Sequence, residues 1–172
     1  MGISAKQAEV LIQQLGVLVV DDNPFMRNVV RNLLHNIGVK KIFDAADGID
    51  ALEMIRSAAP DIVILDWEMP LLNGAELVRI VRSPGVFPFP DIPIIMLTGH
   101  GERWRIVEAV KLGVNEFLCK PVSAKALLDR MVSILLKPRE SVQCGNYYGP
   151  APRKAMIEAL TMIDAPDMPP AA

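Results

Sequence analysis

The chain has 172 residues, 51% of them hydrophobic, and a formal net charge of -2, so it can bury a core and lacks the basic excess typical of nucleic-acid binding. No apolar run approaches the roughly 18 residues that a membrane-spanning helix needs, and the first ten residues lack the apolar centre of a signal peptide. The two cysteines have no metal-ligand spacing. We therefore expect a soluble cytoplasmic protein without a nucleic-acid or membrane partner.

The chain begins with a helical pattern over residues 4–15, in which Ser4 can cap the first turn and Gly16 can end the helix. Short apolar runs then alternate with helical patterns. The predicted strands cover residues 17–20, 41–45, 61–65, 93–97 and 116–119, and the predicted helices cover residues 24–37, 49–58, 74–82, 102–112 and 123–136. This alternation indicates βαβ units and therefore an α/β three-layer sandwich around a parallel sheet.

Residues 138–172 fall outside the alternating pattern because they are rich in proline. We expect a linker there, followed by one short amphipathic helix and a frayed end. The apolar residues at helical spacing are Met156, Ile157, Leu160 and Ile163. The predicted organisation is an N-terminal helical extension (1–15), one domain (16–137) and a C-terminal tail (138–172).

Polar residues stand at the carboxyl ends of the predicted strands. Asp21 and Asp22 follow the first strand, Asp66 follows the third, Thr98 follows the fourth, and Lys120 follows the fifth. Parallel strands end at the same edge of a sheet, and ligands of open α/β sheets bind beyond that edge. These five side chains should therefore meet around one pocket.

The residue types in this pocket suit phosphoryl transfer to a carboxylate. Three converging carboxylates repel one another, and Mg²⁺, which prefers oxygen ligands, removes that repulsion. The metal also neutralises an incoming phosphoryl group, while Lys120 and Thr98 can hold its other oxygens. Asp66 is then the nucleophile that forms an acyl phosphate.

The segments that carry these residues resemble the receiver domain of two-component response regulators, the CheY-like family. The matching pieces, which occur in family order within residues 16–137, are VLVVDDN (17–23), DIVILDWEMP (61–70), PIIMLTGH (93–100) and GVNEFLCKP (113–121). The resemblance implies a flavodoxin-like, five-stranded parallel sheet of order 2-1-3-4-5. It also implies a signalling protein rather than an enzyme. We expect no output domain, because none fits in the residues outside the matching region.

The resemblance assigns a role to each acidic residue of the pocket. Asp66 would be the phosphorylation site. Asp21, Asp22 and Asp66 would bind magnesium together with the backbone carbonyl of Glu68. The phosphoryl donor would be a phosphohistidine on a histidine kinase or a histidine phosphotransfer protein.

The remaining roles implied by the family concern the last two strands. Thr98 and Lys120 would contact the phosphoryl group, and Phe117 would be an aromatic switch that turns inward when Thr98 moves. The Lys120–Pro121 peptide bond would be cis. His100, two residues after Thr98, would lie near the mouth of the site.

Three expectations concern departures from the family pattern or single side chains. The proline-rich stretch 83–93 should lie at the far rim, without effect on the chemistry. Cys119 should be buried and inert. Val10, Leu11 and Leu15 on the first helix could mediate weak dimerisation or only cap the body, so a monomer and a weak homodimer both stay open.

Several functions remain possible on this fold. Phosphorylation-dependent binding of a downstream protein, phosphate-independent binding and a phosphorelay intermediate all fit the same residues. A flavin or nucleotide enzyme is disfavoured because the loop after the first strand is DDNP, whose carboxylates repel phosphate. A haloacid-dehalogenase-type hydrolase is disfavoured because Met69 and Pro70 do not continue its motif after Glu68.

Overall fold

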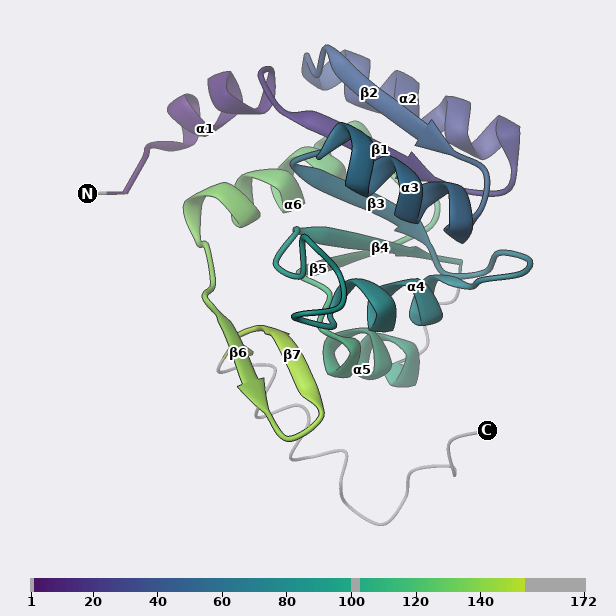
Figure 1. Ribbon diagram of the computed structural model, residues 1–172. Coiled ribbons are helices and arrows are strands. Elements are labelled where there is room, and N and C mark those ends of the chain that lie inside the picture. Colours follow the sequence, from purple (N-terminus) through teal and green to yellow (C-terminus); the bar gives the residue numbers. More distant parts are fainter. Residues whose placement is uncertain (1, 100–102, 154–172) are drawn as a thin grey trace.

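The structure, a computed structural model, describes residues 2–99 and 103–153 (Figure 1). Its centre is a parallel sheet whose strand order, β2-β1-β3-β4-β5, is the predicted one. The strands are β1 (Gly16–Val20), β2 (Lys41–Ala45), β3 (Ile62–Asp66), β4 (Ile94–Thr98) and β5 (Glu116–Cys119). Each lies within one residue of its predicted range, because fully buried aliphatic runs mark the central strands.

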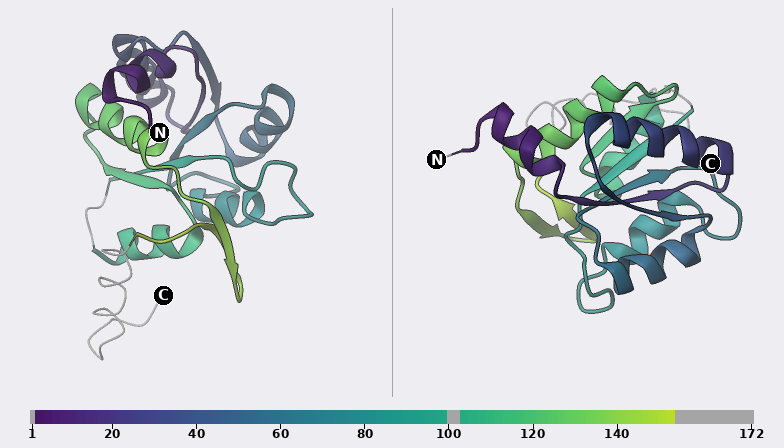
Figure 2. Two further views of the ribbon diagram at one scale, coloured as in Figure 1. Left: turned by 90° about the vertical axis from the view of Figure 1, so that its left-hand side faces the viewer. Right: turned by 90° about the horizontal axis from the view of Figure 1, so that it is seen from above.

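Helices cover both faces of the sheet, which confirms the three-layer α/β architecture (Figure 2). One face carries α1 (Ala5–Ile12), α2 (Pro24–Ile37) and α6 (Ala124–Leu136), and the other carries α3 (Gly48–Ala58), α4 (Gly74–Val81) and α5 (Arg103–Leu112). Side chains of β1 alternate between the two cores: Leu18 packs with α3 and α4, and Val19 packs with α2 and α6. Within residues 2–99 and 103–153, none of the helices is long and apolar enough to span a membrane.

Helix starts at the carboxyl ends of the strands set the surroundings of the site. Asn23 caps α2 by accepting the backbone N–H of Phe25 at 2.9 Å, and Gly38 ends the helix in the left-handed conformation. Gly74 begins α4 directly against the strand that ends in Asp66. A Cβ at Gly74 would lie 2.5 Å from the carbonyl oxygen of Asp66, so only glycine fits there.

The N-terminal helix forms as predicted, but it ends earlier. Ser4 caps α1, and Ala8 and Ile12 are fully buried on the body of the protein. The expectation that Gly16 ends this helix is wrong, because Gly16 is already the first residue of β1. Its N–H donates to Asp61 Oδ2 at 2.8 Å.

The start of the C-terminal tail is not the predicted linker. Strands β6 (Ser141–Cys144) and β7 (Tyr147–Pro150) form an antiparallel hairpin that lies beside α5 (Figure 1). The hairpin turns at Gly145 and Asn146, and Gly145 has a positive φ of 58°. A Gly-Asn pair between two short runs is a recognised hairpin signal that the proline content obscured. The helix predicted over residues 156–163 lies outside the described residues.

Candidate functional site

Strand register brings the predicted site residues to one rim of the sheet. Val20 of β1 lies opposite Leu65 of β3, so the aspartates that follow them emerge side by side. At the other side of the site, the N–H of Lys120 donates to the carbonyl oxygen of Thr98 at 2.8 Å. The predicted convergence of the strand ends is therefore present.

Three carboxylates form the acidic part of the site. One oxygen each from Asp21, Asp22 and Asp66 lies within 4.8 Å of the others. Asp21 and Asp66 are buried, whereas Asp22 is exposed. Asp21 Oδ1 accepts the N–H of Asn23 at 2.9 Å, and Asp21 Oδ2 is buried without a hydrogen-bond partner. A buried carboxylate oxygen without a hydrogen bond, beside two further carboxylates, is a donor set that suits Mg²⁺.

Lys120 is the cation that faces these acids. Its Nζ lies 2.9 Å from Asp66 Oδ1 and 3.7 Å from Asp21 Oδ2. Burial raises the pKa of Asp66, although the hydrogen bond from Lys120 opposes that rise. Burial acts to lower the pKa of Lys120, but its contacts with Asp66 and Asp21 outweigh burial and raise it overall. Lys120 therefore stays charged, and the ionised form of Asp66 gains from any further cation.

Thr98 and Phe117 complete the predicted set. Thr98 is buried at the end of β4, and Phe117 on β5 is partly buried against the core below α5. The Lys120–Pro121 peptide bond is cis, as the family resemblance implies. The switch movement of Phe117 and the metal contact of the Glu68 carbonyl stay predictions.

Arg105 is a site residue that the sequence did not indicate. It lines, with the acids and Lys120, a cavity of about 250 Å³ at the rim. Its Nη2 donates to Glu68 Oε1 at 2.9 Å, and its guanidinium lies 5.5 Å from the ring centre of Trp67 and 5.1 Å from that of Trp104. The two tryptophans were the available signal, since two aromatic rings near one pocket can hold a cation between them.

Two other expectations at this rim have different outcomes. Cys119 is exposed, so the prediction that it is buried is wrong. Side chains of the edge strand β5 alternate between the two faces of the sheet. Glu116 and Leu118 are buried on one face, and Cys119 lies on the other. His100 lies outside the described residues.

Comparison with known proteins finds relatives that match the part of the chain containing the sheet and the site. The family model of the response regulator receiver domain matches residues 17–132. Chemotaxis protein CheY1 of Helicobacter pylori is 37% identical over 120 residues, which are 69% of this chain and 95% of the relative. Chemotaxis protein CheY-3 of Vibrio cholerae is 34% identical over 125 residues, which are 73% of this chain and 95% of the relative.

Solved structures give the same result. The chemotaxis protein CheY4 of Vibrio cholerae has a TM-score of 0.63 and 33% identity, and the match covers 70% of this chain and 98% of that one. The receiver domain of the Francisella response regulator 1452 has a TM-score of 0.63 and 31% identity, with 72% and 97% covered. The hairpin of β6 and β7 lies beyond residue 132, where the family match ends.

Proposed function

The chain belongs to the family of response regulator receiver domains, the CheY-like proteins of two-component signalling, and we propose that Asp66 is its phosphoryl acceptor. The observation that carries this proposal is the contact of Lys120 Nζ with Asp66 Oδ1 at 2.9 Å, beside two further carboxylates within metal-binding reach. A nucleophile, a phosphate-binding cation and a set of metal ligands are thus in one cavity.

The reaction forms one bond and breaks one. An oxygen of the Asp66 carboxylate attacks the phosphorus of a phosphohistidine on a histidine kinase or phosphotransfer protein, and the phosphorus–nitrogen bond breaks. The imidazole nitrogen leaves and takes a proton from solvent. Lys120 and the Thr98 hydroxyl hold phosphoryl oxygens, so charge that develops during transfer meets donors already in place.

Magnesium would be held by Asp21, Asp22 and Asp66, with the backbone carbonyl of Glu68 as a further ligand. When bound, the ion supplies positive charge that offsets the repulsion between these carboxylates and the phosphoryl group. The buried Asp21 Oδ2, which accepts no hydrogen bond, supports this assignment.

The proposed output is binding of a downstream protein by the phosphorylated form, rather than catalysis on a separate substrate. The surface formed by α5, β5 and α6 is the proposed reader surface, because β5 connects it directly to Lys120. A phosphorelay role would use the same site and stays open.

The experiment uses beryllofluoride, a phosphoryl mimic, together with Mg²⁺ and tryptophan fluorescence. The chain has two tryptophans, so a Trp104→Phe background leaves Trp67, the neighbour of Asp66, as the reporter. We expect a fluorescence change that needs both Mg²⁺ and beryllofluoride and is absent in Asp66→Asn. If the Trp104→Phe protein that keeps Asp66 showed no fluorescence change with beryllofluoride at saturating Mg²⁺, phospho-acceptance would be refuted.

A further inference from the structure

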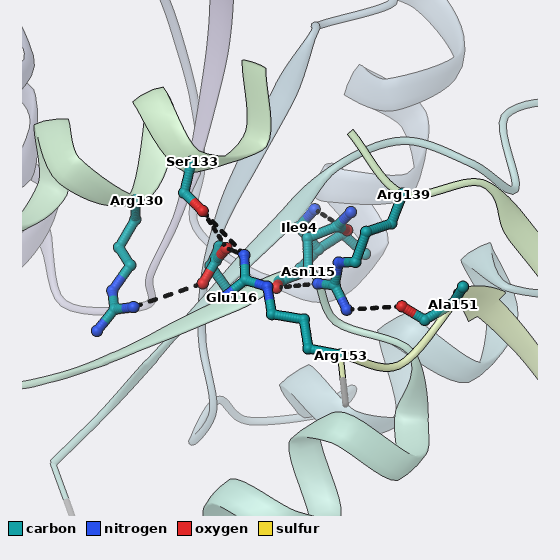
Figure 3. Close-up of polar contacts among 8 residues, drawn as sticks. All are labelled: Ile94, Asn115, Glu116, Arg130, Ser133, Arg139, Ala151 and Arg153. Carbon is teal, nitrogen blue, oxygen red and sulfur yellow. Dashed lines mark hydrogen bonds and ion pairs between the residues drawn. The ribbon is translucent and has the colours of Figure 1, made fainter. Parts of the chain in front are cut away.

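Glu116, at the start of β5, is a buried carboxylate outside the phosphoryl site. Its side chain is 2% exposed. Arg153 Nη2 donates to Glu116 Oε1, and it also donates to Ser133 Oγ at 2.8 Å (Figure 3). Ser133 Oγ in turn donates to Glu116 Oε1 at 3.1 Å, and Arg130 Nη1 lies 3.6 Å from Glu116 Oε2. A buried charge is costly unless it is paired, so this carboxylate is placed to receive a guanidinium.

A second arginine fastens the same C-terminal segment to the edge of the sheet. Arg139 donates through Nη2 to the carbonyl oxygen of Asn115 at 2.5 Å and through Nη1 to that of Ala151 at 3.0 Å (Figure 3). Burial lowers the pKa of Arg139, and the nearby charge of Arg153 lowers it further. The two guanidiniums therefore repel each other, and Glu116 offsets that repulsion.

Backbone contacts seat the hairpin against the end of α5. A Cβ on Gly149 would lie 2.8 Å from the Cα of Gly113, so the backbones of these two segments are in direct contact. Tyr148 adds a hydrogen bond from its hydroxyl to Asp91 Oδ1 at 2.5 Å. The segment from Arg139 to Arg153 is thus docked at several points on the end of the α5–β5–α6 surface that lies away from Asp66.

The strand β5 connects this docked segment to the phosphoryl site. It has four residues and is the edge strand of the sheet. Glu116 is its first residue, and Lys120, which binds Asp66, follows its last. Arg130 provides a second connection, because its guanidinium lies 6.0 Å from the ring centre of Phe117 while it faces Glu116. Lys120 and Phe117 are therefore both connected to the carboxylate that holds Arg153, the first through the strand and the second through Arg130.

We propose that Glu116 forms an arginine-binding site on the surface of β5 and α6, that Arg153 fills it in cis, and that phosphoryl occupancy of Asp66 releases the segment 139–153. The linkage rests on the proposed function. The docked arrangement is the one in which Lys120 pairs with an unmodified carboxylate. A phosphoryl group at Asp66 draws Lys120 to new oxygens, and Arg130, which already faces Glu116 Oε2, moves closer to that carboxylate when it leaves the Phe117 ring and displaces Arg153.

Hydrogen–deuterium exchange of the full chain tests both parts of the proposal. An isolated two-stranded hairpin is marginal in water, so the amides of residues 141–151 should exchange faster once the segment undocks. With Mg²⁺ and beryllofluoride we expect about five-fold faster exchange of these amides in the wild type. This factor is at the lower end of the range usually found for coupling between two sites. In Arg153→Ala, the same amides should exchange fast even without Mg²⁺ and beryllofluoride. Arg31→Ala removes an arginine–carboxylate ion pair that is more exposed, with Asp44 on the opposite edge of the sheet, and should behave as the wild type.

Linkage also requires the reciprocal effect. Because the docked segment opposes modification, Arg153→Ala should bind beryllofluoride with Mg²⁺ about five-fold more tightly than the wild type. The Trp67 signal measures this affinity and reports separately whether the mimic binds.

Each outcome decides a part of the proposal. If the mimic binds and hairpin exchange stays the same or slows, the linkage is wrong. If Arg153→Ala exchanges at the wild-type rate without the mimic, the arginine site does not hold the segment. If the mimic does not bind the wild type, the proposed function fails and the linkage with it, while the exchange of Arg153→Ala still decides the arginine site.

Discussion

The two rims of the sheet are built in different ways. The rim at the carboxyl ends collects Asp21, Asp22, Asp66 and Lys120 because each is the last residue of a strand or lies within two residues after one, so its composition follows from strand positions. The opposite rim is assembled from side chains that bind backbone groups distant in sequence. The difference teaches that a site placed by strand ends is readable from sequence, whereas a rim placed by long-range hydrogen bonds is not.

Arg82 is the centre of the opposite rim. Its side chain is buried and donates to the carbonyl oxygens of Gly113 at 2.8 Å and Pro90 at 2.6 Å, and to Asn115 Oδ1 at 2.9 Å. Burial lowers the pKa of Arg82 to about 10. One arginine thus ties the proline-rich stretch 83–93 to the loop between α5 and β5, against which the hairpin packs.

The largest effect on binding should come from a carboxylate at the site rim. Asp22 is exposed, so Asp22→Asn should leave the fold intact while it removes one proposed metal ligand. We expect the affinity for Mg²⁺ to fall by about 100-fold, measured by titration of Trp67 fluorescence. Asp129→Asn, which removes an exposed carboxylate on α6, should keep the wild-type affinity. Equal affinities for wild type and Asp22→Asn would contradict the metal assignment.

Arg82→Ala should break the opposite rim without changing the site. The carbonyl oxygens of Gly113 and Pro90 lose the Arg82 donor, and Asn115 Oδ1 keeps only the N–H of Ile94, so we expect the free energy of unfolding in urea to fall by about 3 kcal/mol. The Mg²⁺ affinity of the folded protein should be unchanged. Arg79→Ala, on the exposed side of α4, should cost under about 0.5 kcal/mol. An equally small loss of stability for Arg82→Ala would show that the hydrogen bonds of Arg82 contribute little to stability.

The sequence predicted one rim well because hydrophobic runs and caps locate strand ends to within a residue. It also predicted the cluster around Asp66, although the roles of the cluster residues stay proposals. The order of the strands in the sheet was implied by the family resemblance. The sequence did not predict Arg105, whose contacts with Glu68 and Trp67 join α5 to the loop after β3, a pairing of segments far apart in the sequence. Nor did it predict the docked hairpin, because the pairing of Arg153 with Glu116 depends on tertiary packing and has no local pattern.

A glycine pair tests how closely the hairpin sits. Gly113 and Gly85 both have positive φ, 94° and 81°, so alanine strains the backbone at either position. A Cβ at Gly113 would also lie 2.7 Å from the carbonyl oxygen of Tyr148, whereas Gly85 faces open space. We expect unfolding losses of about 2 kcal/mol for Gly113→Ala and about 1 kcal/mol for Gly85→Ala. Equal losses would mean that the hairpin can move away at little cost.

The smallest effect concerns pH at the site rim. Burial raises the pKa of Asp66 above its ordinary value of 3.8, so the folded state binds this proton more tightly than the unfolded state does. The stability from this group is therefore complete below 3.8 and is lost as pH rises through the raised pKa. In metal-free urea titrations, the wild type should lose stability relative to Asp66→Asn as pH rises above 3.8. If the difference in unfolding free energy between the wild type and Asp66→Asn stayed constant, or grew in favour of the wild type as pH rises, the pKa of Asp66 would not be raised by folding.

The central claim is that Asp66 accepts a phosphoryl group with the help of Mg²⁺. The most direct measurement is intact-protein mass spectrometry after incubation with acetyl phosphate, with Mg²⁺ or with a chelator. The account predicts the mass of one added phosphoryl group on the wild type with Mg²⁺, and none with the chelator or on Asp66→Asn. A wild-type protein that gains nothing at saturating Mg²⁺, or an Asp66→Asn variant that gains as much as the wild type, would contradict it.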